Sequence, residues 1–206
     1  GTSAGQNITT GNFNTNIGSS SGFATTTGTN NTTVGYASLY TNTTGVNNVA
    51  VGFQSGYKNV SGTYNTFVGD KAGHESVVSG SAANTFIGQF AGYYVTTGTK
   101  NTILGSYSGN SGGLDIRTSS NNIVLSDGDG NPRVHVDSSG RVFVGTTDTA
   151  NLATHTPNVI TDLQFGCNDG SNISTFGIDR IYFNVGNFYV VNQGATGVKL
   201  VNGATS

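Results

Sequence analysis

Two segments of the sequence decide the fold: residues 65–73 read NTFVGDKAG and residues 84–92 read NTFIGQFAG. Both contain an asparagine, two variable residues, an aliphatic residue and a glycine, and this pattern occurs six times. The aligned segments are Asn14–Gly18, Asn31–Gly35, Asn48–Gly52, Asn65–Gly69, Asn84–Gly88 and Asn101–Gly105. Their final glycines are 17, 17, 17, 19 and 17 residues apart, with two residues inserted around 77–83. Such a period predicts a repeat architecture.

The residue before each of these glycines is aliphatic, and we expect it to form the core of the repeat. These core residues are Ile17, Val34, Val51, Val68, Ile87 and Leu104. Five of them are β-branched, which suits a buried strand position. Side chains alternate along a strand, so the residue two places earlier, usually Thr, shares this face. The intervening residue is expected to point the other way.

Small residues and glycines recur after each strand and indicate tight corners. A 17-residue coil of this kind predicts an all-β fold, with β-solenoid or β-roll repeats across residues 1–110. The predicted core is thin for the number of residues that it must order. We therefore expect several chains, preferably three, to pack together and bury the larger side chains between them. The predicted inter-chain packing residues are Phe67, Phe86, Ile103, Phe23, Tyr40, Tyr57 and Tyr93.

Beyond the repeats, residues 111–147 are predicted to form a Gly/Ser-rich linker followed by short β-hairpins. Residues 148–206 contain several further strand candidates separated by Gly, Asn and Asp turns, and are predicted to form a small C-terminal β domain.

Composition argues against several classes of function. Charged residues make up only 9 % of the 206 residues, and the net charge is −2. No basic patch suggests a nucleic-acid partner, and no apolar run of about 18 residues suggests membrane insertion. The single Cys167 cannot form a disulfide within the chain. Carboxylates are nearly absent from the repeats, so we expect no catalytic site, cofactor or enzymatic activity.

Three sequence features allow alternative interpretations. Asp127, Asp129 and Asn131 alternate as at the start of a calcium loop, but the required Glu is missing, which favours a turn. No two histidines are spaced as zinc ligands, and His135 is expected to face solvent or a neighbouring chain. An ice-binding surface would need two Thr on one face of each strand, whereas the paired Thr residues here are adjacent.

A fourth feature is an aromatic column within the repeats. It comprises Phe23, Tyr40, Tyr57, His74 and Tyr93. Such a column could stack sugars, but packing between coils or chains is the preferred interpretation.

The segments at 65–73 and 84–92 resemble repeats of bacteriophage tail fibres. They are also similar to the head repeats of trimeric autotransporter adhesins, which are left-handed parallel β-rolls. Residues 121–133 and 139–147 resemble the segment that follows such repeats in tail fibres. Residues 197–206 resemble the run that precedes an intramolecular chaperone of the endosialidase type, a domain that is cleaved off after trimerisation. The resemblance implies a homotrimer that ends just before such a chaperone.

These observations lead to the expectation of a structural and receptor-binding fibre of an extracellular phage virion. Its partners would be other virion tail proteins and a host cell-surface glycan or protein. The C-terminal domain would be the tip, with Tyr182, Asn187 and Tyr189 as candidate receptor-binding residues. The alternatives are the head domain of a bacterial trimeric adhesin and, more distantly, a glycan-degrading tailspike.

Overall fold

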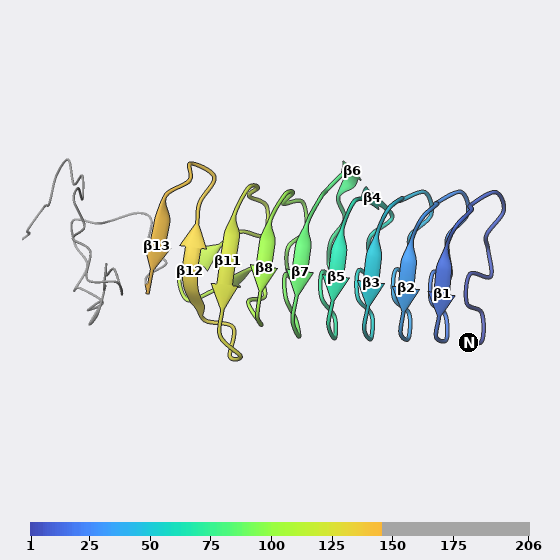
Figure 1. Ribbon diagram of the computed structural model, residues 1–206, viewed down its shortest axis with the longest axis horizontal. Coiled ribbons are helices and arrows are strands. Elements are labelled where there is room, and N and C mark those ends of the chain that lie inside the picture. The colour runs from blue at the N-terminus through green and yellow to red at the C-terminus, as the bar shows by residue number, and fades with distance from the viewer. Residues whose placement is uncertain (146–206) are drawn as a thin grey trace, which may run out of the picture. The chain divides into compact units, whose positions relative to one another are not determined.

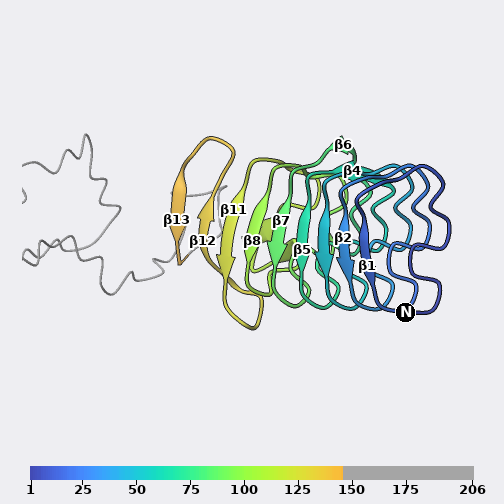
Figure 2. The same ribbon diagram turned by 45° about the vertical axis from the view of Figure 1, so that its right-hand side comes forward.

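The computed structural model describes residues 1–145, and within them every regular element is a β-strand (Figure 1). These residues form a β-solenoid of about seven turns with a spacing of about 17 residues, which confirms the predicted fold class. Figure 2 shows the coils stacked one behind another. The C-terminal domain predicted for residues 148–206 lies outside the described residues.

One sheet of nine strands runs the length of the solenoid. In spatial order its strands are β1 (Thr15–Ile17), β2 (Thr32–Val34), β3 (Val49–Val51), β5 (Thr66–Val68), β7 (Thr85–Ile87), β8 (Thr102–Leu104), β11 (Ile123–Ser126), β12 (Pro132–Val136) and β13 (Val142–Val144). The pairs from β1 to β11 are parallel and place equivalent repeat residues side by side, as in Phe67 beside Phe86. Strands β12 and β13 continue the sheet in antiparallel fashion, as the predicted hairpins require.

Glycine recurs after each strand because the corners of neighbouring coils touch there. Gly52 has a φ of +135°, and a Cβ atom at this position would lie 2.3 Å from the carbonyl oxygen of Gly69. No other residue fits such an approach, so the geometry of the stack fixes the glycine period that the sequence displays.

The strand faces are the reverse of the prediction. Phe67, Phe86 and Ile103, the middle residues of the later strands, were expected to pack between chains. They are instead fully buried inside a single chain. The predicted core residues point outward instead: Ile17, Ile87 and Leu104 are 56 %, 39 % and 41 % exposed, and Val34, Val51 and Val68 are half-buried.

Glycine corners explain why bulky middle residues fit inside a narrow coil. A Cβ atom at Gly56 or Gly73 would lie 2.6 or 2.5 Å from the ring of Phe67. The ring therefore occupies the space that these glycines leave empty. The core continues through Leu39, Ala50, Ala72, Phe86, Ala91, Val95, Ile103, Tyr107, Leu114, Ile116 and Val124.

Parallel stacking does not end at residue 110, where the shaft was predicted to stop. Part of the predicted linker forms an antiparallel pair, β9 (Asn110–Ser111) with β10 (Leu114–Asp115). Leu114 and Ile116 bury their side chains in the core, and β11 then pairs in parallel with β8. The linker is thus part of a larger coil. The insertion around 77–83 likewise forms β6 (Ser79–Ser81), which pairs with β4 (Ser61–Thr63).

Candidate functional site

The outward side of the nine-stranded sheet, from here on the outer face, carries two parallel columns of side chains. One column is Thr15, Thr32, Val49, Thr66, Thr85, Thr102, Ile123, Val136 and Val142, and the other is Ile17, Val34, Val51, Val68, Ile87, Leu104, Leu125, Val134 and Val144. Several of these side chains are well exposed, including Val142 at 62 % and Ile123 at 45 %. The outer face is therefore a continuous, largely apolar stripe. It follows the row of nine strands that Figure 1 shows.

An asparagine ladder fixes the register of the seven parallel strands, from β1 to β11. Its members are Asn14, Asn31, Asn48, Asn65, Asn84, Asn101 and Asn122. The Oδ1 atom of each accepts a hydrogen bond from the backbone N–H of the next, at 2.9–3.1 Å. This asparagine begins every aligned repeat segment of the sequence, but no role was predicted for it. Its fixed place before each strand could have predicted the ladder, because Asn side chains stack well in register.

The aromatic column forms a ladder within the chain. Phe23, Tyr40, Tyr57, His74 and Tyr93 stack in that order with ring centroids 5.0–5.2 Å apart and interplanar angles of 11° or less. Packing between coils is thus confirmed for this column, whereas contact between chains stays a prediction. A sugar cannot stack on the inner rings, because neighbouring rings occupy both of their faces.

Two polar partners support this ladder at its histidine. The His74 Nδ1 atom lies 2.7 Å from Glu75 Oε1, and Lys58 Nζ lies 2.6 Å from Glu75 Oε2. Burial alone would raise the pKa of Glu75, but the hydrogen bonds from Lys58 and His74 hold this pKa below its ordinary value. Glu75 is therefore an ionised partner of the ladder and a poor candidate for general acid catalysis.

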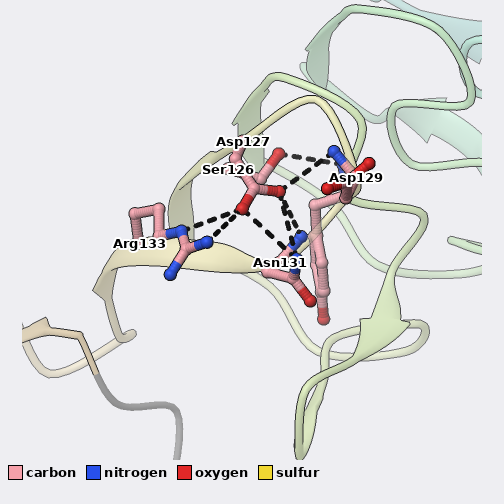
Figure 3. A network of polar contacts seen from close by, with 6 residues as sticks. Ser126, Asp127, Asp129, Asn131 and Arg133 are labelled. Atoms are coloured by element: carbon pink, nitrogen blue, oxygen red, sulfur yellow. Dashed lines mark hydrogen bonds and ion pairs between the residues drawn. The ribbon is translucent and has the colours of Figure 1, made fainter. Parts of the chain in front are cut away.

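The turn between β11 and β12 is closed by Asp127 (Figure 3). Its Oδ1 atom accepts hydrogen bonds from the backbone N–H groups of Asp129 and Asn131, at 3.1 and 2.9 Å. Its Oδ2 atom accepts from Arg133 Nε at 2.9 Å and also pairs with Nη2 of that guanidinium. The Asn131 backbone N–H first, and then the Arg133 side chain, lower the pKa of Asp127 to about 2.

This geometry confirms the turn and argues against the calcium alternative. N–H donors already occupy the oxygens of Asp127 that a cation would need. Within residues 1–145, no group of three or more His, Cys, Asp or Glu side chains could hold a metal ion.

His135 was expected to face solvent or a neighbouring chain, but the structure places it inside. It is 2 % exposed, stacks on Phe143 at 5.6 Å, and its Nε2 atom lies 3.1 Å from Asn122 Oδ1. Burial lowers the pKa of His135. Among the described residues its Nδ1 atom has no hydrogen-bond partner. The sequence missed this because the strand faces were assigned the wrong way round.

The candidate receptor-binding residues Tyr182, Asn187 and Tyr189 lie outside the described residues, as does Cys167. Nothing among residues 1–145 forms a helix long and apolar enough to span a membrane. No protein-family model, curated protein or solved structure matches this chain.

Proposed function

We propose that this chain is a structural and receptor-binding fibre of a phage virion, extracellular and assembled as a homotrimer. The observation that supports this most directly is the outer face, whose largely apolar columns are half-buried or exposed along nine strands of a single chain. Contiguous exposed apolar surface of this kind marks an interaction site. A rigid stack of repeats with such a stripe suits a shaft built from several copies.

A second copy of the chain is the partner that best fits the outer face. Cyclic symmetry places equivalent strands of each copy at the same level, so every aliphatic residue meets its counterparts. The number three rests on the resemblance to tail-fibre and adhesin repeats. In this arrangement the coil interior holds Phe67 and Phe86, while Val51, Val68 and Ile87 form the core shared between chains.

Attachment is the role that we assign to the assembled fibre. The solenoid would act as a stiff spacer, because each coil is tied to the next by the asparagine ladder and the aromatic ladder. Residues 148–206 would form the tip that contacts a host cell-surface glycan or protein, and other virion tail proteins would hold the opposite end. The phage setting rests on the sequence resemblance, and the tip assignment rests on the position and composition of residues 148–206.

The mass in solution tests the assembly. Three chains of 21.1 kDa give about 63 kDa by light scattering or sedimentation. Val68→Glu would place a charge on the shared apolar core, and we expect it to yield a monomer with an unchanged circular dichroism spectrum. The matched control is Thr27→Glu, an exposed position off the sheet, which should remain trimeric. A wild-type mass of one chain would refute the assembly.

Adsorption to host cells tests the attachment role. A virus whose fibre carries Tyr182→Ala, Asn187→Ala and Tyr189→Ala together should lose adsorption while its fibre keeps the wild-type mass. Unchanged adsorption would refute the assignment of the tip. Release of new reducing ends from host polysaccharide would instead identify the chain as a glycan-degrading tailspike.

A further inference from the structure

A cavity of about 440 Å³ lies beside the β11–β12 turn, and none of its lining residues belongs to the two columns of the outer face. Lys71, Gln89, Phe90, Tyr93, Tyr94 and Asp129 contribute to its lining. These residues come from two successive coil corners and from the turn that follows β11. The volume is within the range of about 300–1,000 Å³ that is usual for small-molecule sites.

The cavity occurs where the aromatic ladder ends. Tyr93 is the last ring of the ladder, because the same position in the next coil is Asn110. Phe90 and Tyr94 contact Tyr93 edge-to-face, with centroids 5.8 and 4.7 Å away. Phe90 is 38 % exposed and Tyr94 is 52 % exposed. Unlike the inner rings of the ladder, this group of aromatic side chains therefore presents apolar surface to the cavity.

Polar groups of three kinds surround these rings. Lys71 Nζ lies 5.8 Å from the ring centroids of both Phe53 and Phe90, a placement favoured by the negative ring faces. Asp129 is held by its backbone N–H bond to Asp127, and Gln89 Nε2 lies 3.5 Å from Asp70 Oδ2. Neither Lys71 nor Asp129 belongs to an ion pair among residues 1–145.

We propose that this cavity is a saccharide-binding site. A pyranose ring has C–H groups that pack on aromatic surface, whose faces carry partial negative charge. Its hydroxyls can donate to the Asp129 carboxylate and accept from the Lys71 ammonium and the Gln89 amide. The Asp129 carboxylate disfavours a phosphate or another anion, whereas a purely apolar ligand would leave the charged groups unpaired. A polyhydroxylated ligand with an apolar face satisfies both sets of contacts.

This site is independent of the proposed attachment role, since the lining residues lie in the solenoid and not in the C-terminal domain. Saturation-transfer NMR on the full chain can test it, with the methyl glycosides of glucose, galactose, mannose and N-acetylglucosamine as probes. We expect saturation transfer to at least one glycoside. Tyr94→Ala and Asp129→Asn should each weaken that binding by about tenfold, the effect of losing one hydrogen bond or ring contact.

The matched control is Tyr64→Ala. Tyr64 is 57 % exposed, close to the 52 % of Tyr94, and it does not line the cavity. This variant should bind as the wild type does. The proposal is overturned if none of the four glycosides shows saturation transfer at millimolar concentration. Binding that survives both cavity variants at wild-type strength would overturn it as well. Virus adsorption plays no part in this measurement, so the two proposals fail separately.

Discussion

Replacing one asparagine in the middle of the ladder should destabilise the solenoid far more than its small volume suggests. Asn65 is 1 % exposed, and its Nδ2 atom donates to Asn48 Oδ1 at 3.1 Å. Its Oδ1 atom accepts from the backbone N–H of Asn84, which is fully buried, also at 3.1 Å. Asn65→Ala removes both bonds but leaves the backbone N–H of residue 65 bonded to Asn48.

The magnitude follows from these two bonds. Loss of the side-chain bond to Asn48 costs about 0.5–1.5 kcal/mol, the usual net value of one hydrogen bond. The N–H of Asn84 keeps no partner in a buried position, which adds about 1–3 kcal/mol. We therefore expect Asn65→Ala to lower the free energy of unfolding by about 2–4 kcal/mol.

Urea unfolding followed by circular dichroism, at one fixed protein concentration, measures this difference. Asn12→Ala is the matched control, because Asn12 is exposed and lies outside the ladder. Its cost should stay within about 0.5 kcal/mol, as for most surface substitutions. Equal costs for the two variants would refute the role assigned to the ladder, since they would show that the buried Asn84 amide loses nothing.

Three further predictions address the corners and two titrating groups. Gly73→Ala should be markedly more destabilising than Gly80→Ala, because both glycines have positive φ but only the first would place a Cβ against the ring of Phe67, at 2.5 Å; thermal unfolding of both variants tests this. His135 has a lowered pKa, so its contribution to stability is present above pH about 6.5 and is lost as the pH falls. The free energy of unfolding of the wild type should therefore fall as the pH is lowered below about 6.5, and His135→Gln should remove this dependence. Asp127, with its pKa lowered to about 2 chiefly by the backbone hydrogen bond of its turn, contributes stability above pH about 4 that is lost toward pH 2. Asp127→Asn should remove that acid dependence.

Periodicity made the architecture predictable. A strand in a solenoid must pair with the same strand of the next coil, so the coil length appears directly as the spacing of Gly35, Gly52 and Gly69. The hairpins after β11 were predictable for a related reason, because Asp127 and Asp137 begin turns that their own carboxylates close. The sequence pattern and the local chemistry agree at these places.

Which strand face is buried could not be decided by the rule that aliphatic residues lie inside. Both faces of β5 are apolar, with Phe67 on one and Val68 on the other, so the period-two pattern fits either orientation. Space decides between them: the corners at Gly56 and Gly73 leave a void that only a large ring fills. That information is distributed over three segments of the chain and is not visible within a single strand.

The cavity beside the β11–β12 turn was beyond prediction for a similar reason. Tyr93 belongs to a column that the sequence shows plainly, but Lys71 and Asp129 are far from it in the chain. They meet because the stack brings successive corners together and because the turn after β11 replaces the corner of a further coil. The end of a periodic column is a place where side chains lose their neighbours, and it is there that the ladder can meet a ligand.

The interior of the solenoid changes along its length, and this predicts where it opens first. The middle strand position is Thr33 in β2, bonded at 2.6 Å to both Ser21 and Asn16, but it is Phe86 in β7 and Ile103 in β8. A fully buried Phe or Ile side chain contributes about 1.5–3 kcal/mol, whereas a hydrogen bond adds about 1 kcal/mol net.

The ladder amides form a matched series for testing this difference, because each donates to the preceding asparagine at nearly the same distance. A coil of a solenoid opens less often the greater its local stability is. The amides of Asn31 and Asn48 should therefore exchange hydrogen about tenfold faster than those of Asn84 and Asn101, a ratio that corresponds to about 1.4 kcal/mol. Equal exchange along the ladder would mean that the ladder, and not the interior, sets the stability of each coil.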